Sequence, residues 1–139
     1  LEGNVDFVHD KLGSLLRSFV SVRDTATKAT HENYYHGFLN GIFTNCKDNL
    51  GEYHSNYESG DGYADITFKD IDCRKVAIIE IKSASVGSDL VTLSETALSQ
   101  IEEKNYSEPF MSNRMIQSID AYGIVFSGKN CFISVKKLK

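Results

Sequence analysis

The chain has 139 residues, of which 41% are hydrophobic and 24% charged, and its formal net charge is −4. This length suits one globular domain, and no apolar run approaches the roughly 20 residues of a membrane-spanning helix. The acidic balance argues against a protein that coats nucleic acid non-specifically, because such proteins are basic. The three cysteines form no CxxC or Cys/His zinc pattern, which predicts reduced thiols in a cytoplasmic protein.

The first predicted element is an amphipathic helix over residues 5–21. Its apolar side chains recur at the three- and four-residue intervals of one helix face: Val5, Val8, Leu12, Leu15, Leu16 and Phe19. The polar stretch 23–30 has no periodicity and predicts a connector, with Thr30 a candidate N-cap. Because the chain begins with Leu1 rather than Met, we expect residues 1–29 to act as a lid or as the junction with a missing upstream region.

A second helix is predicted over residues 31–47, where aromatic and aliphatic side chains form a broad stripe. Glu32 and His36 lie one turn apart and share a face of this helix. The helix dipole favours a carboxylate in the first turn, so Glu32 has a structural explanation beside any chemical one. For His36, a structural role is supported at least as well as a chemical role.

Three strands joined by short turns are predicted next. Residues 53–58 alternate aromatic and polar side chains, and the strands 63–69 and 75–82 follow. The glycine-rich segment 60–62 resembles a phosphate-binding loop only superficially, because no GxGxxG or Walker pattern is present and no helix follows. It therefore predicts a tight turn, and the three strands should form an antiparallel meander.

Two charged residues, Glu80 and Lys82, interrupt the most apolar strand, which otherwise is typical of a strand covered on both faces. They lie two positions apart, so their side chains leave the same face. Asp65 lies on the preceding strand, 63–69, and its side chain points to the face opposite the apolar side chains of that strand. An antiparallel pairing of the two strands would bring Asp65 near Glu80. Two carboxylates and an ammonium suit a divalent cation with a positioned water. The alternative is a Glu80–Lys82 salt bridge on a solvated strand face.

A third helix is predicted over residues 89–106. Thr92 and Glu95 could form a capping box, which would start the helix one residue after Thr92. Near the other end, Lys104 and Tyr106 could touch a phosphate, but we expect both to be solvated at the end of the helix.

Residues 107–120 predict a loop with one helical turn, and two strands, 122–126 and 131–135, follow with a hairpin at 127–130. The helix over 89–106 is long enough for a crossover that returns the next strand to the same sheet. The pattern therefore predicts an α/β fold. Its mixed β-sheet would hold a three-strand antiparallel meander, a crossover helix and further strands, with helices on both faces.

The spacing of Asp65 and the E-x-K run 80–82 resembles the D…(D/E)xK signature of the PD-(D/E)XK nuclease superfamily. Further blocks resemble the branch found C-terminal to AAA-ATPase-like domains in bacterial proteins: residues 32–39, 58–66 and 97–106. Ala64 stands where the signature has proline, a position at which many members differ. The resemblance implies a restriction-endonuclease-like fold, with residues 30–139 as the nuclease-like domain and an ATPase-like domain upstream.

The resemblance also implies roles for the charged residues. Asp65 and Glu80 would ligate Mg²⁺ or Mn²⁺, with the backbone carbonyl of Ile81 as a third ligand. Lys82 would orient and help deprotonate the attacking water, or stabilise the charge that builds on the phosphate.

Two more residues enter through the resemblance alone. Glu32 would supply an extra carboxylate from the first core helix, holding a second metal ion or a water. Gln100 occupies a position where the family carries a recurrent glutamine facing the catalytic centre. The implied function is a metal-dependent nuclease acting on nucleic acid, with DNA the expected substrate. The alternatives are a catalytically inactive module that binds nucleic acid or regulates an attached ATPase-like domain, and a protein-interaction domain that uses the first helix.

Overall fold

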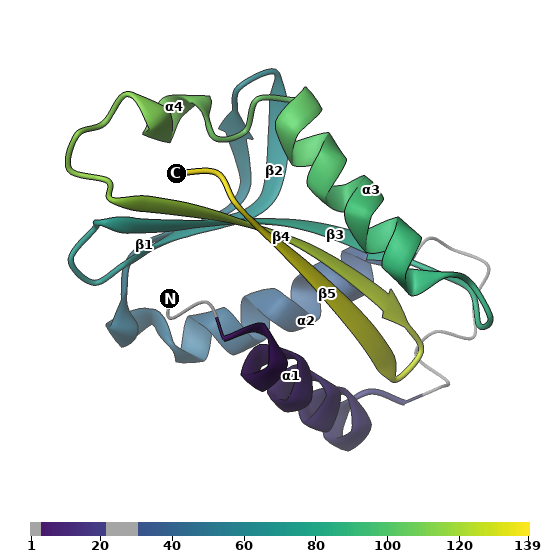
Figure 1. The fold of residues 1–139 in the computed structure, drawn as a ribbon. Helices are drawn as coiled ribbons and strands as arrows, with labels where there is room; N and C mark the ends of the chain where they lie inside the picture. Colours follow the sequence, from purple (N-terminus) through teal and green to yellow (C-terminus); the bar gives the residue numbers. More distant parts are fainter. Residues whose placement is uncertain (1–3, 22–30) are drawn as a thin grey trace.

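The computed structural model describes residues 4–21 and 31–139, and the predicted connector and Thr30 lie outside these ranges. A five-stranded sheet has α1 and α2 on one face and α3 and α4 on the other (Figure 1). The elements in chain order are α1 (Val5–Phe19), α2 (Glu32–Asn45), the 3₁₀ helix η1 (Lys47–Asn49), β1 (Leu50–Ser59), β2 (Gly62–Asp70), β3 (Lys75–Ser83), α3 (Leu90–Glu103), α4 (Glu108–Met111), β4 (Ser118–Ser127) and β5 (Asn130–Lys137).

The sheet confirms the predicted topology. Its strand order is β1-β2-β3-β4-β5, with β1, β2 and β3 forming an antiparallel meander. The chain then crosses over through α3 and α4, so β4 pairs parallel with β3, and β5 returns antiparallel to β4. β1 and β4 are longer than predicted, because backbone pairing continues beyond the predicted ends of both strands.

The structure confirms the predicted start of α3 at residue 89, but the capping box at Thr92 and Glu95 is wrong. The carboxylate of Asp89 accepts hydrogen bonds from the backbone N–H groups of Val91 and Thr92, at 3.1 and 3.2 Å. Asp89 is therefore the N-cap, and the helix begins at Leu90 rather than after Thr92. The physical reason is that an aspartate side chain satisfies the unpaired donors of the first turn, so no later capping box is needed.

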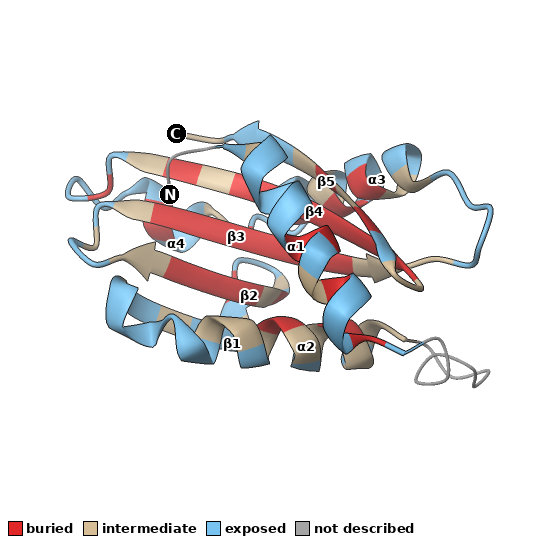
Figure 2. Ribbon diagram, turned by 90° about the horizontal axis from the view of Figure 1, so that it is seen from below, coloured by how far each residue is buried: buried red, intermediate tan, exposed pale blue. Residues whose placement is uncertain are grey.

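Hydrophobic clusters lie on both faces of the sheet. On one face Leu16, Tyr35 and Phe126 belong to a single buried cluster, and the rings of Tyr35 and Phe126 stack with centroids 4.4 Å apart. On the other face Ile78 packs in a cluster that includes Ile101 of α3. β3 contributes alternate residues to the two clusters and is buried along most of its length (Figure 2). The prediction that this strand is covered on both faces is confirmed.

The turn between β1 and β2 packs against the end of α3. The N–H of Asp61 donates to the carbonyl of Lys104 at 2.8 Å, and the hydroxyl of Ser59 donates to the carbonyl of Tyr106 at 2.7 Å. Tyr106 is only 3% exposed, so its expected solvation is wrong, whereas Lys104 is exposed. Tyr106 is buried because α4 and this turn cover it. The contact ties the β1–β2 hairpin to α3.

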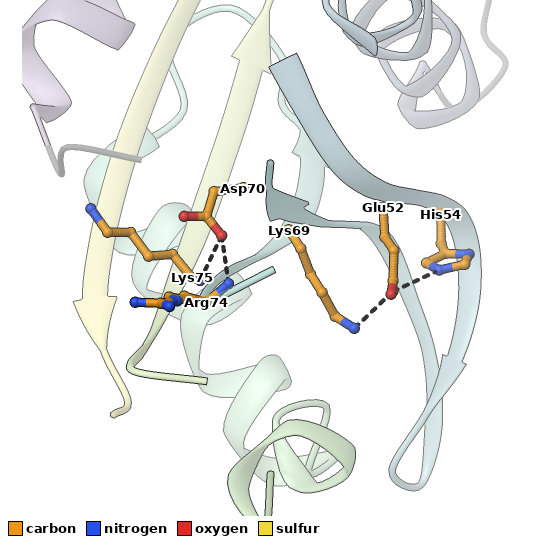
Figure 3. A network of polar contacts seen from close by, with 6 residues as sticks. All are labelled: Glu52, His54, Lys69, Asp70, Arg74 and Lys75. Atoms are coloured by element: carbon orange, nitrogen blue, oxygen red, sulfur yellow. Dashed lines mark hydrogen bonds and ion pairs between the residues drawn. The ribbon is translucent and has the colours of Figure 1, made fainter. Parts of the chain in front are cut away.

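A polar network supports β1, β2 and the turn from β2 to β3 (Figure 3). Its members are Glu52, His54, Lys69, Asp70, Arg74 and Lys75. A carboxylate oxygen of Asp70 accepts from the backbone N–H groups of Arg74 and Lys75, at 2.7 and 2.8 Å. Burial raises the pKa of Asp70, but these two hydrogen bonds and nearby positive charge outweigh it, and the pKa is lowered. The ionised side chain therefore closes the turn that sets the register of β2 against β3.

Candidate active site

The antiparallel register of β2 and β3 brings two carboxylates together. Ile66 pairs with Ile79, so Asp65 and Glu80 occupy the next opposed positions. The backbone N–H of Ile81 donates to Asp65 Oδ2 at 2.7 Å, which fixes the Asp65 carboxylate against β3. The structure therefore places Asp65 beside Glu80, as the hairpin pattern predicts.

Glu80 and Lys82 share the face of β3 that lies under α3. Lys82 Nζ donates to Glu80 Oε1 at 3.0 Å and to Gln100 Oε1 at 2.7 Å. The face of α3 that packs on the sheet carries the buried residues Ser94, Ala97 and Ile101. Gln100 directly precedes Ile101, so its side chain lies beside this packed face and reaches the site. An ammonium has three donors, so these two contacts leave one N–H of Lys82 for another acceptor.

Desolvation by burial is the largest influence on the pKa values of Glu80 and Asp65. Glu80 is 3% exposed, and its Oε2 atom has no hydrogen-bond partner among the described residues. Desolvation, together with the negative charge of Asp65, raises the pKa of Glu80 to about 7, against the opposing effect of Lys82. Desolvation also raises the pKa of Asp65, while the Ile81 N–H and the charges of His36 and Lys82 oppose the shift. The Glu80–Lys82 salt bridge of the alternative interpretation is present, but Glu80 is buried rather than on a solvated strand face.

Glu32, at the first turn of α2, lies close enough for its negative charge to raise the pKa of both Asp65 and Glu80. In the described part of the chain, no three His, Cys, Asp or Glu side chains converge closely enough to enclose a metal ion. Mg²⁺ nevertheless needs only one or two protein carboxylates and keeps several waters. A buried carboxylate with an unpartnered oxygen, Glu80, beside a second, half-buried carboxylate, Asp65, forms a donor set that fits such a cation.

Two residues near the site were not assigned roles in advance. The Nε2 atom of His36 lies 3.0 Å from the backbone carbonyl oxygen of Asp65, and the only sequence signal was its spacing from Glu32. Gly123 of β4 lies beside Glu80 in the sheet, and a Cβ there would be 2.2 Å from the carbonyl oxygen of Ser94. A lone glycine inside a strand signals such a close approach, and here it lets α3 lie directly over the site.

The raised pKa of Glu80 predicts an unusual pH dependence for the metal-free protein. The folded state binds this proton more tightly than the unfolded chain, whose glutamate has a pKa of 4.5. Stability should therefore fall as pH rises from about 4.5 to about 7, by up to about 3 kcal/mol. Glu80→Gln removes the ionisation, so we expect this variant to be more stable than the wild type at pH 8 and similar to it at pH 5.

Urea unfolding at pH 5 and pH 8, with a chelator present, measures this effect. Glu52→Gln is the matched control, because the hydrogen bond from Lys69 lowers the pKa of Glu52. Its ionised form stabilises the fold above the unfolded pKa, so this control should lose stability at pH 8 rather than gain it. Parallel stability profiles for the wild type and Glu80→Gln would contradict the assigned burial of the charge.

A mixed sheet with helices on both faces, and with Asp65, Glu80 and Lys82 grouped on adjacent strands, defines an α/β domain of the restriction-endonuclease-like class. The profile of the PD-(D/E)XK nuclease superfamily matches residues 30–136, and the chain belongs to this superfamily. Its members typically use divalent metal ions. No curated protein matches the chain significantly. None of the helices within residues 4–21 and 31–139 is long and apolar enough to cross a membrane.

Proposed function

We propose that this protein is a divalent-metal-dependent nuclease that hydrolyses phosphodiester bonds of nucleic acid, with DNA as the expected substrate. The observation that carries the proposal is the buried Glu80 carboxylate beside Asp65, with Oε2 unpartnered among the described residues and Oε1 paired to Lys82. A fold gains nothing from burying the Glu80 carboxylate beside the half-buried, like-charged Asp65, whereas a cation relieves both the repulsion between them and the desolvation of Glu80. Membership of the nuclease superfamily supports the reaction class.

The carboxylates of Asp65 and Glu80 and the backbone carbonyl of Ile81 would hold Mg²⁺ or Mn²⁺. The Ile81 N–H orients the Asp65 carboxylate for this task through a 2.7 Å hydrogen bond. When bound, such a cation lowers the pKa of water and polarises a phosphoryl oxygen. Glu32 adds negative charge at the edge of the site and is the candidate ligand of a second ion or of a water.

Lys82 acts on the reacting groups. Its contacts with Glu80 and Gln100 hold the ammonium in place, and its remaining N–H can donate to the attacking water or to a phosphate oxygen. A fixed positive charge in a partly buried site stabilises the negative charge that builds on the phosphate. Gln100 contributes by accepting a hydrogen bond from Lys82, which keeps the ammonium aimed across the strand face.

The second candidate function is a module of the same fold that binds nucleic acid without cleaving it, or that regulates an attached ATPase-like domain. The net charge of −4 favours it, because a nuclease that grips DNA by itself normally presents a basic surface. The blocks that resemble the ATPase-associated branch support an upstream ATPase-like domain in either case. Three unpaired cysteines support a cytoplasmic location.

Calorimetric titration of Mn²⁺ and Mg²⁺ into the metal-free protein tests the site without a guess about the substrate. We expect saturable binding that Asp65→Ala weakens by at least about 100-fold, because the variant removes a ligand. Asp120→Ala is the matched control, since Asp120 is a half-buried aspartate on the neighbouring strand β4, three positions from Glu80 in register.

Unchanged binding in Asp65→Ala would refute the proposed ligand set. If the wild type binds neither ion, the titration is repeated with a DNA duplex present, because substrate phosphates can complete a magnesium site. Continued absence of binding would favour the inactive module.

A further inference from the structure

The strand pairing of β2 lapses at Asp65. Its neighbours Ala64 and Ile66 pair with β1 in one unbroken register, but Asp65 and the opposite residue, Asn56, do not form a pair. Asn56 has a φ of 52°, in the left-handed region, so the backbone of β1 kinks at this point. On the other side, the pairing of β2 with β3 ends at Ile66 and Ile79. The residue that carries the first carboxylate therefore stands where the sheet supports its main chain least.

A histidine side chain from α2 replaces the missing support. His36 Nε2 lies 3.0 Å from the backbone carbonyl oxygen of Asp65. A carbonyl oxygen can only accept, so Nε2 must carry the proton and donate it, and this fixes the tautomer of the ring. The main chain of Asp65 is thus held from α2, while its carboxylate is held from β3 by the Ile81 N–H.

The imidazole of His36 is itself braced. Ser55 Oγ also lies 3.0 Å from His36 Nε2, where it shares the single Nε2 proton as a second acceptor, and Asn40 Nδ2 donates to Ser55 Oγ at 3.1 Å. The hydroxyl of Tyr53 donates to Asn40 Oδ1, and burial raises the pKa of Tyr53 to about 12, so this hydroxyl keeps its proton. A continuous chain of polar groups therefore joins α2 to β1 and ends on the Asp65 carbonyl.

We infer that His36 is a positioning residue of the proposed nuclease site. It holds the main chain of Asp65 through an Nε2–H···O=C hydrogen bond, with Ser55, Asn40 and Tyr53 as its brace. The inference rests on the proposed function and deepens it, because it names the groups that aim the first metal-ligating carboxylate. Residues that orient a ligand in this way change metal affinity by about 10- to 100-fold when they are removed.

Hydrogen exchange of the Ile81 amide tests the inference in the metal-free protein, because this N–H donates to the Asp65 carboxylate. We expect His36→Ala to speed exchange at Ile81 by about tenfold relative to amides of the β4–β5 ladder, as a local opening does. His36→Gln keeps an N–H donor at similar reach and should restore most of the protection. His9→Ala is the matched control, because His9 Nε2 also lies near a backbone carbonyl, that of Cys131 at 3.1 Å.

Calorimetry with Mn²⁺ on the same four proteins completes the test. We expect His36→Ala to weaken binding by about 10- to 100-fold, His36→Gln to recover most of it, and His9→Ala to bind like the wild type. If the wild type binds Mn²⁺ and His36→Ala binds equally well, or exchanges equally slowly at Ile81, the inference is wrong and the proposed function stands. If the wild type binds no Mn²⁺, even with a DNA duplex present, the proposed function fails. The exchange rates then decide separately whether His36 holds Asp65.

Discussion

Replacing Lys82 with alanine is expected to lower the rate of phosphodiester cleavage by about 10³-fold or more, with the fold intact. The ammonium is the only cation hydrogen-bonded to Glu80 among the described residues, and it is positioned by both Glu80 and Gln100. Its loss removes a fixed positive charge from a site that must stabilise a developing negative charge. Glu80→Ala should be equally damaging, because it removes a proposed metal ligand and the partner of Lys82 together.

Single-turnover cleavage of plasmid, duplex, single-stranded DNA and RNA, in Mg²⁺ and in Mn²⁺, measures this effect. Lys69→Ala is the matched control. Lys69 lies on the adjacent strand β2, is ion-paired to Glu52 at 2.8 Å, and has a side chain 17% exposed against 23% for Lys82. Full activity in Lys82→Ala or in Glu80→Ala would refute the catalytic assignment, and equal losses in Lys69→Ala and Lys82→Ala would reduce it to a stability effect.

Gly60→Ala is expected to lower the free energy of unfolding by about 3 kcal/mol. A Cβ at this position would lie 2.2 Å from the carbonyl oxygen of Asn105 and 2.4 Å from that of Lys104. Neither backbone atom can rotate away, so the β1–β2 turn must separate from the end of α3. The φ of Gly60 is 56°, which adds the ordinary cost of a side chain in the left-handed region.

Gly128→Ala separates these two costs. Gly128 has nearly the same φ, 58°, but no atom lies within 4 Å of the Cβ that alanine would add. We expect this variant to lose only about 1 kcal/mol in urea unfolding, from the backbone conformation alone. Equal losses in the two variants would show that the contact between the β1–β2 turn and α3 contributes nothing to stability.

Much of the fold could be predicted because it depends on local periodicity. Alternation and short turns identified the meander, and the length of the crossover helix predicted the parallel return of β4. The same hairpin logic placed Asp65 beside Glu80. The errors at the Thr92 capping box and at Tyr106 have different causes. The cap is chosen by local competition between Asp89 and Thr92 for the same first-turn N–H groups, whereas the burial of Tyr106 depends on packing between distant segments.

Residues of the site that lie far apart in sequence were harder to predict. Gln100 entered only through a family resemblance, and its contact with Lys82 depends on how closely α3 approaches the sheet over Gly123. The contact of His36 with the Asp65 carbonyl joins α2 to β2 across 29 positions. No spacing rule predicts a hydrogen bond between elements whose relative placement is set by the core. The catalytic roles of these residues remain predictions.

The sequence by itself determined the class of fold and the identity of the charged residues, because strand alternation and the spacing of Glu80 and Lys82 follow directly from backbone geometry. Only the tertiary structure decided the burial of these charged groups, their distances from one another and hence their pKa values. Burial under α3 and the proximity of Asp65 raise the pKa of Glu80 to about 7, and both require elements that come together only in the folded chain. Electrostatic free energy depends on desolvation and on distances between groups, and neither quantity is encoded in the order of residues along one strand.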